Sequence, residues 1–199
     1  MGPIKSNMEL LLPFLDAGVR VEEVDGIPAM EISRRDEVLE ANAYYFGKKE
    51  WMAGWLAHVH RYPEFRERWD AVAGRWDGKV VVDIGCGPGN LLRSLEGAPQ
   101  IAIGIDVARG SLEMAAELGY VPLLADVHAI PLRSGIADVV ALNATLHHCV
   151  DMDTVLLEAA RLVKPGGVLV LDHDPQVSAW NYRGLGLAVW KLRSRCTDG

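Results

Sequence analysis

The sequence predicts an α/β domain in which a doubly wound parallel sheet follows a mainly helical N-terminal extension. From Lys79 onward, strand-like and helix-like segments alternate along the chain, as they do in parallel α/β sheets. The first strand-like segment, Val80–Ile84, is almost entirely apolar, which is typical of a central parallel strand. Glycines at positions 85, 87 and 89 then end the strand, and helical spacing begins at Asn90. A strand, a glycine-rich turn and a helix N-terminus together form a nucleotide-binding corner.

Length and composition restrict the class of protein. A chain of 199 residues, 50% of them hydrophobic, is long enough for one globular domain with an N-terminal extension. The formal charge of −7 argues against nucleic acid as the main partner. The scattered cysteines Cys86, Cys149 and Cys196 predict reduced thiols instead of disulfides or a zinc site. Because no apolar stretch has transmembrane length and no signal-peptide core is present, we expect a cytoplasmic protein, without a metal site.

Residues 1–78 are expected to form the extension, which begins with an apolar segment and a β-hairpin. Asp25 and Gly26 lie between two β-prone runs, which is the strongest local signal for a tight hairpin turn. Pro28 lacks a backbone N–H, so it should confine the second strand to a sheet edge.

Three helices are expected to complete the extension, at about residues 33–46, 49–60 and 63–72. They carry most of the aromatic side chains of the chain. These aromatics either pack the helices on one another and on the sheet, or cover a ligand and line a pocket. The two interpretations are compatible.

Residues 79–199 are expected to form the nucleotide-binding core. Its five strands are predicted at residues 80–84, 101–106, 121–125, 137–143 and 168–172. The helices between them are predicted at about residues 90–96, 109–118 and 154–163. Right-handed crossovers then place the five strands in the order 3-2-1-4-5.

The glycine spacing and the nearby charge indicate which nucleotide fits the turn. The dinucleotide fingerprint is G-x-G-x-x-G, whereas Gly85, Gly87 and Gly89 are spaced G-x-G-x-G and Asn90 occupies the place of the third glycine. Asp83 lies where the first strand ends. A carboxylate there would repel a pyrophosphate but would suit a ligand that carries an ammonium group.

The run Val82-Asp-Ile-Gly-Cys-Gly-Pro-Gly89 resembles the first motif of the class I S-adenosylmethionine-dependent methyltransferases. Within that class it is most similar to the small-molecule branch that includes the ubiquinone and menaquinone C-methyltransferases. The resemblance covers about residues 79–175. It implies S-adenosyl-L-methionine as the methyl donor, S-adenosyl-L-homocysteine as the product and a small or lipid-like acceptor. The cofactor would lie on Gly85, Cys86, Gly87 and Gly89, with its amine on Asp83.

The C-terminal part departs from this family. Relatives usually continue with two more strands after strand five, whereas here residues 178–195 read as one amphipathic helix and strands six and seven are apparently missing. Strand five would then be a bare edge, which natural sheets avoid. The N-terminal hairpin covers this edge, or a second copy or partner chain pairs with it, or the sequence is truncated.

Two further strand ends carry candidate cofactor residues. Asp106 ends strand two, where a carboxylate accepts both ribose hydroxyls of a nucleotide. The alternative is an N-cap for the following helix. Asp126 follows strand three at the position where, by resemblance, an acidic side chain accepts from the adenine amine; the alternative is an ordinary loop aspartate. By resemblance, Val127 would pack on the adenine ring, and so would one of the two residues that flank Asp106, Ile105 or Val107.

The segment after strand four carries the candidate catalytic residues. By resemblance, the backbone at Asn143 faces the methionine portion of the cofactor. His147 and His148 are candidate general bases, because histidine titrates near neutral pH. Alternatively, one of them orients the loop or the next helix. Adjacent residues point in different directions, so at most one histidine is expected to face the substrate.

Asp172, His173 and Asp174 end strand five at the same edge of the sheet. Alternate residues of a strand point to opposite faces, so the three side chains are not expected to converge on a metal. One of them is a candidate contact for the acceptor.

The function that these residues favour is transfer of a methyl group from S-adenosylmethionine to a small or lipid-like acceptor. One alternative is a partner subunit that binds the cofactor but is inactive, prompted by the missing strands. Another is an NAD-dependent oxidoreductase, which Asn90 and Asp83 disfavour. The sequence does not identify the acceptor or the oligomeric state.

Overall fold

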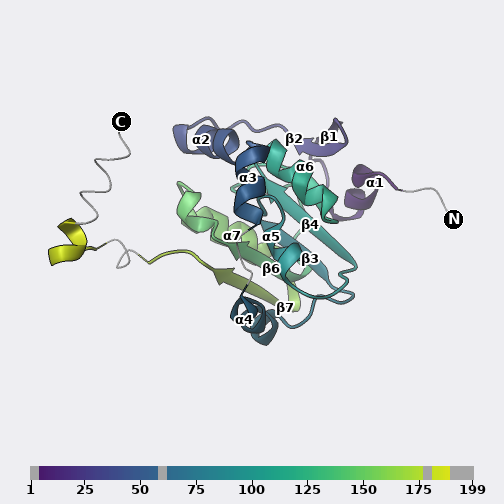
Figure 1. Cartoon of the computed structure of the whole chain (residues 1–199). Helices are drawn as coiled ribbons and strands as arrows, with labels where there is room; N and C mark the ends of the chain where they lie inside the picture. The colour runs from purple at the N-terminus through teal and green to yellow at the C-terminus, as the bar shows by residue number, and fades with distance from the viewer. Residues whose placement is uncertain (1–4, 58–61, 177–180, 189–199) are drawn as a thin grey trace.

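The computed structural model describes residues 5–57, 62–176 and 181–188. Its centre is a twisted sheet with helices on both faces (Figure 1). The strands are β1 (Val21–Val24), β2 (Ile27–Met30), β3 (Val80–Ile84), β4 (Ile101–Asp106), β5 (Val121–Leu124), β6 (Ala137–Asn143) and β7 (Val163–Asp172). The helices are α1 (Asn7–Leu11), α2 (Glu37–Phe46), α3 (Lys49–Leu56), α4 (Pro63–Ala73), α5 (Asn90–Ser94), α6 (Arg109–Glu117) and α7 (Met152–Leu162), and the 3-10 turns are η1 (Leu12–Phe14) and η2 (Leu146–His148).

The five predicted core strands have the predicted arrangement. The order β5-β4-β3-β6-β7 is the expected 3-2-1-4-5, and all four neighbouring pairs are parallel. The first strand, β3, is central because it pairs with both β4 and β6, which explains its continuous apolar sequence. The last strand starts earlier than predicted, at Val163, and a bulge accommodates the Lys-Pro-Gly-Gly segment.

The prediction of a sheet without its two terminal strands is not confirmed, because the described sheet has seven strands. The two additional strands are the N-terminal hairpin, in which Asp25 and Gly26 adopt positive φ angles of 51° and 77° at the turn. The hairpin joins the sheet through β2 and β5, at the edge opposite β7. The alternative in which the hairpin covers strand five is therefore wrong.

Pro28 does not lie on an edge strand, contrary to the expectation. Strand β2 lies between β1 and β5. Its contact with β5 is limited to one paired position, Ala29 opposite Leu124, so no long hydrogen-bonded ladder is required beside the proline.

Two hydrophobic cores lie on the two faces of the sheet, because successive residues of β3 point to opposite sides. Val82 and Ile84 pack with Leu11 of α1 and with the apolar face of α7. Val81 packs on the other face with Trp69 of α4 and with buried residues of α5 and α6. The extension thus shares both cores of the sheet, and its boundary at residue 78 stays a prediction.

The sequence predicted a bare sheet edge at the last core strand, which is β7 in the structure. Among the described residues, no strand pairs with β7 on its outer side, although α4 contacts it. Residues 184–188 are helical and lie apart from the sheet, with Leu185 83% exposed. The rest of the predicted helix at 178–195 lies largely outside the described residues. No described helix is long and apolar enough to cross a membrane.

Candidate functional site

The glycine turn after β3 is held by the end of β4 and by the loop after β6. Gly85 and Cys86 both donate their backbone N–H to the Ile105 carbonyl, at 2.8 and 3.1 Å. Gly85 has a φ of 69°, and a Cβ there would approach Thr145 Cγ2 to 2.4 Å. Gly87 has a φ of 51°, but a Cβ there would meet no protein atom within 4 Å. The turn is therefore closely packed at Gly85 and open toward the cavity at Gly87.

Asp106 connects this turn to the end of β4. Its carboxylate accepts from the Gly87 N–H and from the Ala108 N–H, both at 2.9 Å. Burial raises the pKa of Asp106, while the backbone N–H groups oppose this shift. Asp106 and Val107 both line the cavity described below, as predicted for residues that contact a ligand.

Asp83 lies behind the turn and not among the residues that line the cavity. Its Oδ2 accepts from the Tyr120 hydroxyl at 2.6 Å, and that hydroxyl accepts from the Leu92 N–H. Burial raises the pKa of Asp83 to about 7, although the Tyr120 hydrogen bond opposes the shift. The carboxyl predicted to hold the ligand amine is thus bound to Tyr120 and supports the turn from beneath.

Asp126 lines the cavity, but its carboxylate already has several partners. Arg34 Nε donates to Oδ2 at 2.7 Å, and the His128 N–H and Nδ1 lie 3.0 and 2.7 Å from Oδ1. Burial opposes ionisation, but Arg34 and His128 hold the pKa of Asp126 below its ordinary value. Arg34 also pairs with Asp36, the N-cap of α2, at 2.7 Å. Adjacent Val127 lines the cavity too.

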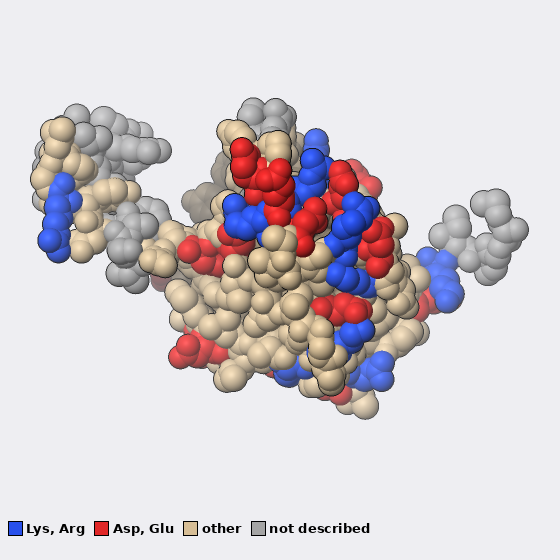
Figure 2. All heavy atoms as spheres, turned by 90° about the horizontal axis from the view of Figure 1, so that it is seen from below, with Lys and Arg blue, Asp and Glu red and all other residues tan. Residues whose placement is uncertain are grey.

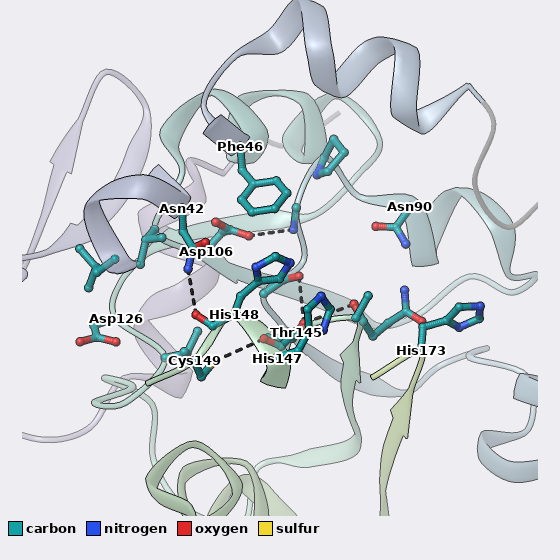
Figure 3. Close-up of a pocket in the computed structure, with 18 of the residues that line it drawn as sticks. Asn42, Phe46, Asn90, Asp106, Asp126, Thr145, His147, His148, Cys149 and His173 are labelled. Atoms are coloured by element: carbon teal, nitrogen blue, oxygen red, sulfur yellow. Dashed lines mark hydrogen bonds between the residues drawn. The ribbon is translucent and has the colours of Figure 1, made fainter. Parts of the chain in front are cut away.

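A cavity of about 510 Å³ opens above the carboxyl ends of the parallel strands (Figure 3). This volume falls in the range of about 300–1,000 Å³ that is typical of small-molecule sites. Gly85, Gly87, Asp106, Asp126 and Asn143 all line it. The cavity therefore brings together the predicted ends of β3, β4, β5 and β6, where open α/β sheets bind ligands.

Asn90 also faces this cavity, although sequence reasoning considered it only as a departure from the dinucleotide pattern. It is 5% exposed, and its Nδ2 makes no hydrogen bond within the described part of the chain. A buried amide donor without a partner is unfavourable unless a ligand accepts from it. Asn90 Nδ2 is thus a donor at the cavity whose hydrogen bond is not made by the described residues.

Both candidate catalytic histidines line the cavity, and which of them faces a substrate stays a prediction. His147 and His148 lie in the 3-10 turn η2 and not in an extended segment. Their ring centroids are 4.1 Å apart, and the His148 ring meets Phe46 edge-on at 5.1 Å. Figure 3 shows the two rings side by side in the cavity beneath Phe46. Burial, and then the neighbouring His147, lower the pKa of His148.

Asp172, the last residue of β7, and Asp174 contact different partners, while His173 Nδ1 lies 3.2 Å from Asp172 Oδ2. Asp172 accepts from Arg68 and Trp69 Nε1, at 2.8 and 3.0 Å. Asp174 Oδ1 instead accepts from the His147 N–H and lies 2.8 Å from His147 Nδ1. His173 turns the chain between them with a φ of 59° and lines the cavity. In the described part of the chain, no group of three or more His, Cys, Asp or Glu residues is placed to hold a metal.

Comparisons with known proteins agree with this geometry. Residues 82–171 match the methyltransferase domain family. Over these residues the chain is a class I S-adenosylmethionine-dependent methyltransferase domain.

The relatives of this methyltransferase domain cover only part of the chain. A ubiquinone biosynthesis O-methyltransferase from Pectobacterium atrosepticum is 38% identical over 118 residues, which are 55% of this chain and 48% of the relative. An uncharacterized 37.1 kDa protein in transposon TN4556 of Streptomyces fradiae is 36% identical over 110 residues, 51% of this chain and 32% of the relative. The match thus spans about half or less of these relatives.

Among solved structures, the [4+2]-cyclase SpnF superposes with a TM-score of 0.55 at 20% identity, covering 70% of this chain and 62% of that one. This similarity shows the fold alone. Because one fold supports several reactions, the chemistry of the methyltransferase domain has to be argued from its site.

The residues of the methyltransferase domain fit the cofactor of its class, S-adenosylmethionine. The open position at Gly87 leaves room for close approach, and Asp106 beside it offers carboxylate oxygens to ribose hydroxyls. The unpartnered amide of Asn90 offers a donor to the carboxylate end of an amino acid. No phosphate is needed to satisfy any of these groups.

Sequence reasoning missed several of the cavity residues that the extension and the β5 loop supply. These are Arg34, Leu39, Asn42 and His128, whereas Phe46 and Trp55, which also line the cavity, were among the aromatic side chains of the predicted helices. The aromatic content of the predicted helices was a signal for this role, since covering a ligand was one of its two interpretations. No sequence signal identified Arg34, because its partner Asp126 lies 92 positions away in the chain.

Proposed function

We propose that this protein transfers a methyl group from S-adenosylmethionine to a small or lipid-like acceptor. The observation that carries the proposal is the junction of Gly87 and Asp106, where an open glycine and a carboxylate face one cavity. In the proposal, Asp106 binds the ribose hydroxyls. Asn90 and the backbone at Asn143 bind the aminoacyl end, opposite the adenine.

The adenine end of the proposed site lies at Val107, Asp126 and Val127. The two valines offer apolar surface to the ring, and Asp126 accepts from the exocyclic amine. Because Arg34 and His128 already bind this carboxylate, the adenine amine shares it with them. Asp83 is not a direct ligand in this proposal; with Tyr120 it supports the turn.

The remainder of the cavity is the proposed acceptor side. Its walls are Asn42 and Phe46 of α2, Trp55 of α3, and the histidines of η2. An apolar, aromatic wall with a few polar groups suits a small organic or lipid-like molecule. The relative from Pectobacterium is by its name an O-methyltransferase of ubiquinone biosynthesis, which supports an acceptor of this kind.

The main catalytic task of the chain is to position the two reactants. Bound S-adenosylmethionine supplies a methyl group already activated by the adjacent sulfonium. The glycine turn and Asp106 line one side of the cavity, and residues of α2 and α3 line the other. Orientation of this kind accounts for roughly 7–11 kcal/mol of a barrier in favourable cases.

Calorimetry with S-adenosylhomocysteine tests the proposal. We expect micromolar binding that is about 10- to 100-fold weaker in Asp106→Ala, because a hydrogen bond to a charged group contributes about 1.5–3 kcal/mol. Asp153→Asn, an exposed aspartate on α7, is the matched control and should bind normally. Binding of NADH in place of S-adenosylhomocysteine would indicate an oxidoreductase. A failure to bind either compound would reject the proposal.

The proposal extends to partners and location. The unpaired outer side of β7, within the described residues, supports a second copy or partner chain at this edge, which light scattering tests. Cys86 and Cys149 are free thiols, which supports a cytoplasmic location. On the face in Figure 2, Lys and Arg side chains lie among Asp and Glu side chains, which supports the expectation of no nucleic-acid partner.

A further inference from the structure

The loops after β6 and β7 are both held in a strained conformation at the floor of the cavity. Ala144 and His173 follow these neighbouring strands directly and have positive φ angles of 56° and 59°. Such angles cost of order 1–3 kcal/mol each for residues other than glycine and occur where surrounding structure enforces them. The Ala144 N–H donates to the Asp172 carbonyl at 2.8 Å, so the two loops are tied together.

The result of this arrangement is a histidine–carboxylate pair. Asp174 Oδ1 lies 3.1 Å from the His147 backbone nitrogen and 2.8 Å from His147 Nδ1. Two donors on one carboxylate oxygen fix the position of the pair. An ionised carboxylate can only accept, so in the neutral ring beside it Nδ1 would carry the proton and Nε2 would keep a free electron pair. His147 lines the cavity, and its side chain is 34% exposed.

We propose that His147, positioned by Asp174, is the general base of this site and that the acceptor reacts through a hydroxyl oxygen. This inference rests on the proposed methyl transfer and adds the class of acceptor. A base is required only where the nucleophile must lose a proton, as a phenol or alcohol does and an ionised thiol does not. Asp174 is a positioning residue, since it acts through His147.

The step balances without any further reactant. A lone pair of the acceptor oxygen forms the new O–CH₃ bond, and the sulfur–methyl bond breaks with its electron pair going to sulfur. The hydroxyl proton moves to His147 Nε2, and the Asp174 carboxylate stabilises the resulting imidazolium. The products are a methyl ether, a neutral thioether and one proton, which the partly exposed ring releases to solvent.

His148 is less suited to this role than its neighbour. Burial lowers its pKa, its ring packs edge-on against Phe46, and its backbone carbonyl accepts from Asn42 Nδ2 at 3.0 Å. Within the described residues no carboxylate hydrogen-bonds to its ring, and Asp174 acts on it only through a weaker electrostatic interaction. With these contacts, His148 lines the acceptor side of the cavity.

The titratable groups that face His147 set the pH dependence. They are Asp174 from the chain after β7 and His148 from the same turn, while Cys149, two positions along the chain, interacts electrostatically with Asp174. Burial raises the pKa of Cys149 to about 11, so this thiol stays neutral at assay pH. Replacing Asp174 by Asn removes the only negative charge in this set. Because the imidazolium is then less stable, the acidic limb of the pH–rate profile should move to lower pH.

The experiment follows methyl transfer from labelled S-adenosylmethionine to two probes, catechol and thiophenol. Thiophenol is ionised near neutral pH and needs no base. We expect His147→Ala to lower kcat for catechol by about 100-fold, within the 10²–10⁴ range of general-base catalysis, and to leave thiophenol methylation within about 3-fold. Asp174→Asn should lower kcat for catechol by at least about 10-fold and shift its pH profile, with KM changed little. The matched control Asp153→Asn should alter neither rate.

A second measurement follows the ring directly. In ¹⁵N-histidine spectra, His147 should carry its neutral-state proton on Nδ1. Asp174→Asn should keep this tautomer, because the His147 N–H still holds the side-chain oxygen in place, and Asp174→Ala should lose it. An Nε2–H tautomer in the wild type, equal losses for both probes, or no transfer to catechol would overturn the proposal. Calorimetry with S-adenosylhomocysteine on each variant separates these outcomes, since lost binding in the wild type rejects the methyltransferase proposal itself.

Discussion

Replacing Asp83 by Asn should remove a pH dependence of folding that this buried carboxyl causes. Asp83 is 1% exposed, and its pKa is raised from 3.8 to about 7 by burial. The folded protein therefore binds a proton that the unfolded chain releases between about pH 4 and pH 7. The resulting stabilisation is complete below about pH 4 and is lost as the pH rises through about 7.

The magnitude follows from the size of the shift. A change of about 3 pKa units corresponds to about 4 kcal/mol over the whole range, and about 3 kcal/mol of it falls between pH 5 and pH 8. Asn carries no charge to bury at pH 8 and still offers an oxygen to the Tyr120 hydroxyl, which lies 2.6 Å from Asp83 Oδ2. The difference in free energy of unfolding between Asp83→Asn and the wild type should therefore favour the variant more at pH 8 than at pH 5.

Urea unfolding of both proteins at several pH values measures this difference. Comparing the variant with the wild type cancels the titrating groups that do not interact with Asp83, whereas Asp106 does interact with it and helps to raise its pKa. Parallel stability curves for the two proteins from pH 5 to pH 8 would refute the reasoning. The same variant also tests the role of Asp83: a large loss of S-adenosylhomocysteine affinity would favour the direct amine contact that the sequence predicted.

Three further substitutions test the turn and the adenine end of the cavity. Gly85→Ala should lower the free energy of unfolding by at least about 2 kcal/mol in urea titrations, because its φ is positive and Thr145 blocks the new Cβ. Gly87→Ala should lower the free energy of unfolding by only about 1–2 kcal/mol, because its φ is positive. It should weaken S-adenosylhomocysteine binding about 10-fold in calorimetry, since the methyl group enters the cavity. Equal effects of the two alanine substitutions on stability and on binding would contradict this contrast. Arg34→Met should lower stability at pH 7 by about 1–2 kcal/mol, because Asp126 loses a charged partner. The pKa of Asp126 is lowered in the folded state, so this loss should shrink as the pH falls below about 4, and a loss that stays constant in acid would argue against the ion pair.

The core of the fold could be predicted because its signals are local. The apolar run at β3, the glycines after it and the alternation of strands and helices each depend on neighbouring residues only. The right-handed crossover rule then gives the order of β5, β4, β3, β6 and β7. The hairpin was predicted from Asp25 and Gly26, but its place beside β5 was not, because sheet pairing over such a distance leaves no local pattern.

The positions of the candidate site residues could also be predicted from local signals, but their contacts could not. Strand ends place Asp106, Asp126 and Asn143 at the cavity, since the carboxyl ends of parallel strands share one edge. What local reasoning misses is which group a side chain meets. Asp83 meets Tyr120, and His147 meets Asp174, 27 positions away in the chain.

The most direct test of the account is a crystal structure of the protein with S-adenosylhomocysteine. We predict that the compound lies in the cavity, with its ribose hydroxyls hydrogen-bonded to Asp106 and with one side of the compound against the backbone of Gly87. Its sulfur should face the side lined by His147 and His148, where the acceptor would bind. A cavity that remains empty in such crystals, or that takes up a dinucleotide diphosphate instead, would contradict the account.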